Sequence, residues 1–453
     1  MKLSQKNRKK YLLSLRDDPD KLIEIILEQD RRIKQLEEQL EDAERAALRP
    51  AAPFRRPEKK HKKNPKTPGR KKDHPGSARI TPSTVDQTIE VPLTVCPECG
   101  FPVDDTKTVE QYIEEIPPIR PHVTRLITHR TQCKHCGTRV RSSHPLQVSH
   151  ASGAAGVHLG PRALSLALEL VYQHGLTKRK TRQVLKSAFN LSISPGGLIH
   201  ASHRIGKRLN KTYQRLKQTI KQSHVLHADE TSWWVGGPHR WLWVFTNPDL
   251  TLYQVCPSRA REVIRRIIGD SFNGVLVSDC LNIYDDVCRI QHKCYSHHLN
   301  AISKAIESHP KKGGGFLLNL RSLLQTAIIV GKIWDTFSQK NKLDLRMRLE
   351  RRANKLLKLP RGDPGEESIR RRLLKQQDHL FTFLDYPGVD PTNNLAERQL
   401  RPAVIARKLS CGNKTPKGAR TWQILTSISA SSQQNQLSFR HIIEQAVFAF
   451  SPS

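Results

Sequence analysis

VLHADET (residues 225–231), VLVSDC (residues 275–280) and DPTNNLAERQLRPAVIARK (residues 390–408) are the stretches that decide the fold of this chain. The first two read as apolar strands that end on Asp229 and Asp279, and the third reads as a helix that carries Glu397. A carboxylate at the end of a buried strand is costly unless a cation or a hydrogen-bond donor meets it. Brought together, the three carboxylates suit two hard divalent ions, Mg²⁺ or Mn²⁺, in the geometry that clamps a phosphodiester.

The residues around the first two stretches predict a mixed sheet. SHVLHADE, TSWWVGG, PHRWLWVFTN and TLYQVCPS alternate as antiparallel strands, with a turn at residues 236–238, and residues 259–270 read as a helix before the strand at 275–278. Three strands, a helix and a fourth strand are the order of the ribonuclease H-like fold, where the first and fourth strands are neighbours. We therefore expect Asp229 and Asp279 to lie side by side. The tryptophans are expected to pack in the core rather than stack on bases, namely Trp233, Trp234, Trp241 and Trp243.

The charge of the chain predicts a polyanionic partner. The 453 residues include 76 Lys and Arg but only 42 Asp and Glu, which gives a net charge of +34. Such an excess is typical of proteins that bind nucleic acid, with or without chemistry of their own. No apolar run approaches the roughly 20 residues that span a bilayer, and the N-terminus lacks a signal-type core. We expect no membrane partner and a cytoplasmic, nucleoid-associated protein.

Two N-terminal segments precede the cysteines. Apolar residues at heptad spacing from Leu22 to Ala47 predict a helix or coiled coil over residues 1–48, which favours a homo-oligomer. A single amphipathic helix packed on its own protein is the alternative. Residues 49–88 form a basic linker rich in Pro and Lys, either solvated or in contact with DNA.

Nine cysteines include two CxxC pairs, each followed by Gly. An odd number of cysteines and matched pairs favour one structural Zn²⁺ over disulfides, and the long gap between the pairs favours a zinc ribbon within residues 89–150. Residues 122–130 are expected to form one of its strands. A redox dithiol is the alternative. The expected zinc ligands are Cys96, Cys99, Cys133 and Cys136.

Residues 151–222 read as three helices, the second of which is basic. A short basic helix, a turn and another helix are typical of a helix-turn-helix DNA-binding domain, although a generic three-helix packing unit has the same pattern. The residues expected to face phosphates or base edges are Lys178, Arg179, Lys180, Arg182 and Lys186.

The rest of the chain is divided by its periodicity. Residues 223–310 are expected to form the first part of the core, 311–384 a helical insertion, 385–425 the last part with Glu397, and 426–453 a C-terminal helical segment. The chain is thus expected to be a multidomain α/β protein. Basic residues that follow Glu397 either bind phosphate oxygens or form a solvated face, namely Arg398, Arg401, Arg407 and Lys408.

Together these motifs resemble the insertion sequence 66 family of DDE transposases. The resemblance rests on HADET at residues 227–231, SDC at 278–280 and NNLAERQLRP at 393–402, and it covers nearly the whole chain, including the order of its modules. It implies that Asp229, Asp279 and Glu397 are the metal-binding triad. It further implies transposition at terminal inverted repeats into target DNA, with small accessory proteins encoded by the same element.

One motif departs from that family. Members commonly carry Cys-Trp-Ala-His-Xaa-Arg-Arg after the second Asp, whereas this chain has CYSHHLN at residues 294–300, so both arginines are missing. We interpret His292, Cys294, His297 and His298 as a packing element that holds a histidine near the substrate, rather than as a second metal site.

Two other functions fit part of the pattern. A domesticated DNA-binding regulator would keep the zinc module without catalysis, although all three carboxylates are present. A metal-dependent nuclease would cut without joining.

Overall fold

A mixed sheet carries the first two carboxylates. The computed structural model describes residues 28, 79–104, 107–148, 156–237, 239–308 and 315–448. The strand order is β5-β4-β3-β6-β7, in which β3, β4 and β5 are antiparallel while β6 and β7 run parallel to β3. The strands are β3 (Val225–Trp234), β4 (His239–Thr246), β5 (Thr251–Cys256), β6 (Val275–Ser278) and β7 (Ile290–Lys293). The first and fourth strands of this sheet are neighbours, as predicted.

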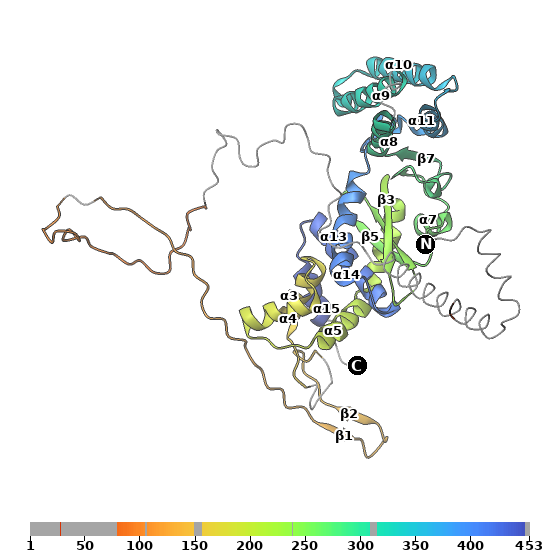
Figure 1. Cartoon of the computed structure of the whole chain (residues 1–453). Helices are drawn as coiled ribbons and strands as arrows, with labels where there is room; N and C mark the ends of the chain where they lie inside the picture. The colour runs from red at the N-terminus through yellow and green to blue at the C-terminus, as the bar shows by residue number, and fades with distance from the viewer. Residues whose placement is uncertain are drawn as a thin grey trace, which may run out of the picture.

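Helices α7 (Arg261–Ile268) and α13 (Asn394–Ser410) cover opposite faces of the sheet, and α14 (Pro416–Gln434) contributes to the apolar cluster on each face. Alternate residues of a strand point to opposite faces, so Leu226 and Ala228 share one face and His227 and Asp229 the other. The first face packs with α7 in the largest apolar cluster. The second packs on α13 and α14, where Trp233 contacts a cluster that includes Leu400. Figure 1 shows α13 and α7 on opposite sides of β3.

Helix α14 also protects the free edge of the sheet. The outward backbone N–H groups of Thr251, Tyr253 and Val255 on the edge strand β5 donate to side chains of α14. Their acceptors are spaced four residues apart, so they share one helix face: Ser431 Oγ at 3.0 Å, Ser427 Oγ at 2.8 Å and Gln423 Oε1 at 3.0 Å. The backbone N–H groups at this edge therefore have hydrogen-bond acceptors without another strand, which prevents the edge from pairing with a second chain.

The helices that precede the sheet share its core. Buried Leu168, Leu185 and Leu198 belong to the same apolar cluster as the sheet residue Phe245 and the α14 residue Leu425. The sequence predicts one helix as the third of this region, but the structure has two helices there, because the chain bends at Leu209. The helices before the sheet are α3 (Pro161–Tyr172), α4 (Lys178–Phe189), α5 (Pro195–Arg208) and α6 (Asn210–Thr219). The C-terminal helix α15 (Phe439–Phe448) packs beside them.

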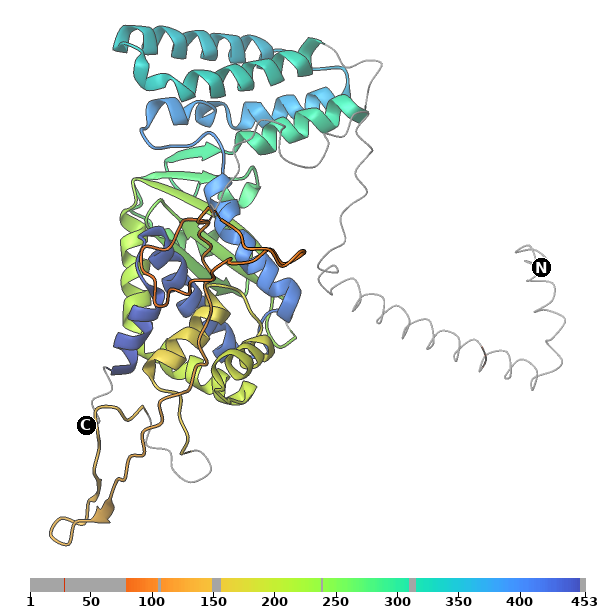
Figure 2. The same ribbon diagram turned by 90° about the vertical axis from the view of Figure 1, so that its left-hand side faces the viewer.

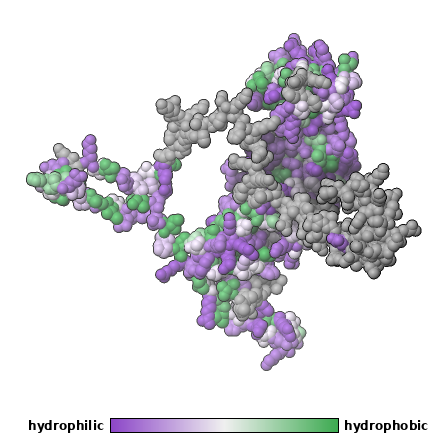
Figure 3. All heavy atoms as spheres, viewed as in Figure 1, coloured by the Kyte–Doolittle hydropathy of each residue, from purple (hydrophilic) through white to green (hydrophobic). Residues whose placement is uncertain are grey.

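A second helical body lies between β7 and α13 in the sequence and at the far end of the sheet in space (Figure 2). Its core is continuous with Val275 and Val277 on β6. Its arginines make ion pairs within this body, such as Arg370 with Glu367 at 2.7 Å and Arg346 with Asp385 at 2.9 Å. Hydrophilic side chains dominate its visible surface (Figure 3). The helices are α8 (Tyr295–Ser308), α9 (Gly315–Lys332), α10 (Gln339–Leu357), α11 (Pro364–Lys375) and α12 (Thr382–Asp385).

The cysteine-rich segment, which precedes α3, projects away from the body formed by the sheet and its flanking helices (Figures 1 and 2). It holds a two-stranded sheet of β1 (Arg130–Gln132) and β2 (Arg139–Arg141) around the second CxxC turn. The strand expected at residues 122–130 was misplaced, since the pairing begins only at Arg130, where the chain turns back around Cys133 and Gly137. The predicted coiled coil and most of the basic linker lie outside the described residues. Among the helices that are described, none combines the length and apolarity needed to cross a membrane.

Candidate active site at the end of the central strands

Parallel pairing of β3 with β6 brings the two aspartates together. Val225 pairs with Val275, Leu226 with Leu276 and His227 with Val277 in a constant register. Extended by two residues, this register sets Asp279 opposite Asp229. Asp279 directly follows the last residue of β6, and its negative charge contributes to the raised pKa of Asp229, so the two carboxylates are neighbours at the end of the central strands.

Glu397 lies in the first turn of α13. Its helix begins after Asn393, which is fully buried and occupies the N-cap position without a side-chain hydrogen bond to the first turn of α13. Instead the Asn393 amide donates to the carbonyl of Ala228 on β3 at 2.8 Å, and its Oδ1 lies 3.1 Å from His227 Nδ1. Since the amide nitrogen donates to Ala228, Oδ1 is the acceptor and His227 is the donor. Asn393 thereby fixes the start of α13 beside Asp229.

Asp229 is buried among other carboxylates. Burial, together with the smaller effects of the negative charges of Glu230, Asp279 and Glu397, raises the pKa of Asp229 to about 7. Backbone N–H groups hold both aspartates in place, from Glu230 to Asp229 at 2.8 Å and from Leu281 to Asp279 at 2.9 Å. Without a cation, Asp229 therefore gains and loses its proton near neutral pH, where an ordinary aspartate is ionised.

A fourth carboxylate lies on the opposite face of β3. Glu230 is buried, and burial raises its pKa, but it accepts hydrogen bonds from Arg259 at 2.5 and 2.7 Å and from the Tyr284 hydroxyl. The Arg259 guanidinium also stacks over Trp241 at 4.5 Å. Glu230 thus has partners of its own, whereas no arginine or lysine ion pair to Asp229, Asp279 or Glu397 occurs among the described residues.

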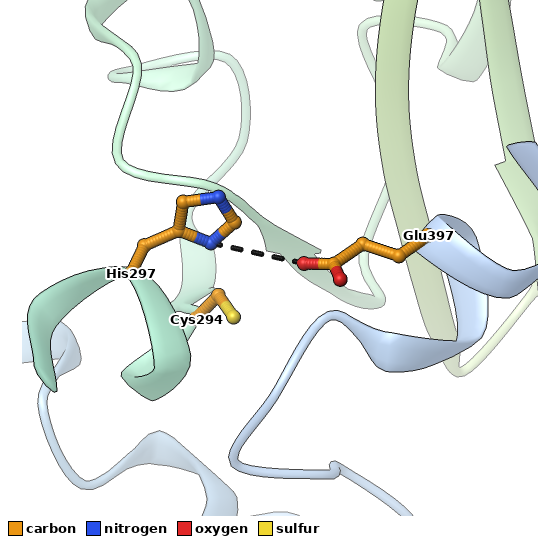
Figure 4. A group of neighbouring side chains, drawn as sticks. All are labelled: Cys294, His297 and Glu397. Carbon is orange, nitrogen blue, oxygen red and sulfur yellow. Dashed lines mark ion pairs between the residues drawn. The ribbon is translucent and has the colours of Figure 1, made fainter. Parts of the chain in front are cut away.

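Two residues at the start of α8 face Glu397 (Figure 4). Cys294 Sγ, a His297 ring nitrogen and a Glu397 carboxylate oxygen lie within 4.8 Å of one another, and His297 Nδ1 is 3.9 Å from Glu397 Oε1. The neighbouring histidines differ, because burial lowers the pKa of His292 to about 4 and of His298 to about 3. Those two pack in the interior, in line with the packing interpretation, while His297 is the histidine near the carboxylates.

The basic residues of α13 are not equivalent. Arg398 and Arg401 are exposed and Lys408 is half-buried on the helix that bears Glu397. Arg407, expected to bind phosphate, instead donates from Nη1 to the Thr231 hydroxyl at 2.9 Å and to the carbonyl and hydroxyl of Ser232. Its guanidinium fastens α13 to β3, so Arg398, Arg401 and Lys408 are the better placed cations for a phosphate.

The basic residues of α4 show a similar division. Arg179, Lys180, Arg182 and Lys186 are exposed, whereas Lys178 is half-buried, with its ammonium 5.8 Å from the Tyr172 ring. Burial lowers the pKa of Lys178. Four of the five predicted α4 contacts, Arg179, Lys180, Arg182 and Lys186, are therefore open to a polyanion.

The two CxxC pairs form separate turns. Gly100 N–H donates to the Cys96 carbonyl and Gly137 N–H to the Cys133 carbonyl, both at 2.9 Å, and each glycine has a positive φ. Hydrogen bonds lower the pKa of Cys96, chiefly from the Cys99 backbone, and of Cys136 to about 7, chiefly with Thr138. These turns favour thiolates, but their four sulfur atoms do not converge: within the described ranges, only Cys294, His297 and Glu397 form a group of metal-ligand atoms.

Sequence reasoning missed Asn393 as an anchor and the approach of His297 to Glu397. The two asparagines before the helix indicate a polar residue at its start, and the spacing of Cys294 and His297 places them on one helix face. Neither pattern identifies a partner that lies 100 or more residues away in the sequence.

Comparison with known proteins adds a family to this geometry. The family model described as Transposase IS66 family matches residues 156–421, from before α3 into α14. A protein of Sinorhizobium fredii (strain NBRC 101917 / NGR234), named "Uncharacterized protein y4qI", is 22% identical over 264 residues. The similarity covers 51% of this chain and 48% of that relative, so the chain spans about half of the relative's length.

Proposed function

Since this chain belongs to the IS66 transposase family, we propose that it cleaves DNA at the ends of an insertion sequence and joins those ends to target DNA. The observation that carries the proposal is the parallel pairing of β3 with β6, the two strands that lead to Asp229 and Asp279. Burial is the main cause of the raised pKa of Asp229, and the negative charges of Asp279 and Glu397 contribute to it, which supports a shared site for the three residues. We take the sheet and its flanking helices as a ribonuclease H-like core, in which these three residues are the catalytic triad.

The donor set fits hard divalent ions. The three carboxylates are neighbours without a lysine or arginine ion pair among the described residues, and the pKa of Asp229 lies near neutral pH, where an ordinary aspartate is ionised. Two Mg²⁺ or Mn²⁺ ions held by Asp229, Asp279 and Glu397 would supply the charge that lowers the pKa of the attacking hydroxyl and stabilises the leaving oxygen.

The protein groups position the rest of the reaction. Backbone N–H groups orient Asp229 and Asp279, and Asn393 sets the place of Glu397. The exposed Arg398 and Arg401 neutralise the scissile strand from the same helix. After cleavage, the freed 3′-hydroxyl attacks a phosphodiester of target DNA in the same site.

The other modules are assigned to recognition. We propose that α4 and α5 bind the terminal inverted repeats as a helix-turn-helix, that the CxxC turns bind one structural Zn²⁺, and that the N-terminal residues support a homo-oligomer. Cys96, Cys99, Cys133 and Cys136 would close their site only when the two turns come together. Small accessory proteins of the same element are proposed partners.

A strand-cleavage and joining assay tests this function. The substrate is a labelled duplex that carries the repeat flanking the gene, with Mg²⁺ or Mn²⁺, and the chain is compared with Asp279→Asn and Glu397→Gln. The controls are Asp270→Asn and Glu262→Gln, which make the same chemical changes at exposed positions outside the site. Metal-dependent cleavage and joining, lost only in the two site variants, supports the transposase. Cleavage without joining would identify a nuclease, and binding that is unchanged in every variant would identify a regulator.

A further inference from the structure

We propose that Cys294, His297 and Glu397 form a second metal site, specific for Zn²⁺-class ions, that shares Glu397 with the carboxylate triad. Their ligand atoms lie within 4.8 Å of one another (Figure 4). Cys294 directly precedes α8, His297 lies in the first turn of α8, and Glu397 lies in the first turn of α13. This site revises our interpretation of the C-x-x-H motif as packing alone.

The separations suit a tetrahedral ion. Ligands at 2.0–2.3 Å on one zinc lie about 3.3–3.8 Å apart. His297 Nδ1 and Glu397 Oε1 are 3.9 Å apart, so an ion needs only a small shift of one side chain. The Glu397 side chain is 44% exposed and has room for that shift.

The surroundings also point to a cation between these groups. His297 Nδ1 is buried, and no hydrogen-bond partner for it occurs in the described part of the chain. The Asn393 backbone N–H donates to Cys294 Sγ at 3.1 Å, which complements the charge of a metal-bound thiolate. One ion would give His297 Nδ1, which makes no hydrogen bond within the described residues and lies 3.9 Å from the Glu397 oxygen, a direct ligand bond, while the N–H donated to Cys294 Sγ would remain in place.

The donor chemistry selects the ion. A thiolate and an imidazole prefer borderline ions such as Zn²⁺ and Co²⁺, whereas Mg²⁺ prefers oxygen ligands. Binding releases the Cys294 thiol proton to solvent, forms bonds from sulfur, nitrogen and oxygen to the ion, and leaves a fourth position open. Three protein ligands and one open position are the usual arrangement of an accessible zinc site.

Sharing of Glu397 makes the two sites compete. An ion bound to Cys294 and His297 holds Glu397 and withdraws it from the hard-ion pair. Zinc is then a reversible inhibitor of strand cleavage, a consequence that rests on the proposed function, whereas metal binding itself does not.

Cobalt spectroscopy tests the site without activity. The metal-free full chain is titrated with Co²⁺, and thiolate-to-cobalt absorption gives the number of bound ions. The CxxC turns contribute equally to every variant, so Cys294→Ser and His297→Ala should each bind one equivalent fewer than the wild type. Cys288→Ser is the matched control, since Cys288 is partly buried outside the cluster, where its thiol bonds the Ile290 carbonyl. His297 is 40% exposed, so its variant stays informative if Cys294→Ser does not fold.

Equal stoichiometry and identical spectra in all four proteins would overturn the site. Inhibition is measured separately as the Zn²⁺ concentration that halves each protein's own Mg²⁺-dependent cleavage rate. We expect His297→Ala to need at least about tenfold more zinc than the wild type. An absence of cleavage in every protein would count against the proposed function, while the cobalt result would still decide the site.

Discussion

At the scale of single residues, Asp229 combines the proposed function with a cost in stability. Its folded pKa of about 7 lies well above the ordinary 3.8, because the side chain is buried among other carboxylates. The folded state therefore holds a proton that the unfolded state has released between about pH 4 and 7. Stability falls as pH rises through that window, the reverse of the usual aspartate case.

We predict that Asp229→Asn stabilises the metal-free chain by roughly 2–4 kcal/mol at pH 8, since a neutral amide removes the buried charge. The gain should shrink as pH falls to 5 and vanish below about pH 4, where Asp229 is neutral in both states. Denaturant unfolding in the presence of a chelator measures it, with Asp270→Asn as the exposed control. A gain that does not change with pH would contradict the raised pKa.

Asn393 is the residue on which the position of Glu397 depends. We predict that Asn393→Ala lowers the free energy of unfolding by about 1–3 kcal/mol, because the Ala228 carbonyl and His227 lose their partner in a buried place. Strand cleavage should fall with it, since the start of α13 loses its tether to β3. Asn394→Ala, at the exposed next residue, should change neither quantity. Equal effects of the two variants would rule out the anchoring role.

At the scale of elements, α13 divides its cations between structure and substrate. We predict that Arg398→Ala combined with Arg401→Ala weakens DNA binding and reduces the salt slope of log K by about 2, one per phosphate contact, with little change in stability. Arg407→Ala should instead lower the melting temperature, because it releases Thr231 and Ser232. Binding isotherms at several salt concentrations and thermal melts separate the two effects. A lower salt slope for Arg407→Ala alone would reverse the assignment.

Helix α14 offers an internal comparison of two buried serines. Ser427 Oγ accepts from Tyr253 N–H, whereas the Ser429 hydroxyl is buried without a partner in the described structure. We predict that Ser427→Ala costs about 1–3 kcal/mol, while Ser429→Ala is neutral or stabilising. Denaturant unfolding of both variants under one condition decides it. Equal losses would show that packing, and not protection of the β5 edge, determines the role of Ser427.

At the scale of the whole molecule, helices from both ends of the described body share one core with the sheet. Leu198 of α5 is fully buried in the cluster that contains Phe245 of β4 and Leu425 of α14. The basic helices and the candidate active site are therefore expected to unfold together, although α4 and α5 read from the sequence as a module of their own.

We predict that Leu198→Ala lowers stability by about 2–5 kcal/mol and speeds hydrogen exchange in β5 and α14 as much as in α5. Leu318→Ala, on the half-exposed face of α9, should leave those segments unchanged. Hydrogen exchange read by peptide mass measures both. Faster exchange confined to α3–α6 would instead show an independent domain.

The sequence by itself determined the strands, their order and the carboxylate at each end, because alternation of apolar residues and turn chemistry are local properties. It also indicated the basic α4. Of the four tryptophans expected in the core, Trp233 and Trp243 are buried and Trp241 is partly buried, whereas the prediction is wrong for Trp234, which is 39% exposed. Their partners were not predictable, because a side chain's partner depends on which distant segments the fold brings together.

Only the tertiary structure decided that Asn393 bonds Ala228, that Arg407 fastens a helix to β3, and that His297 faces Glu397. In each case one residue type serves two purposes: an amide caps or anchors, a guanidinium binds phosphate or backbone, and a histidine packs or binds metal. The sequence names the chemical group, but burial and the distance to its neighbours determine which purpose it serves.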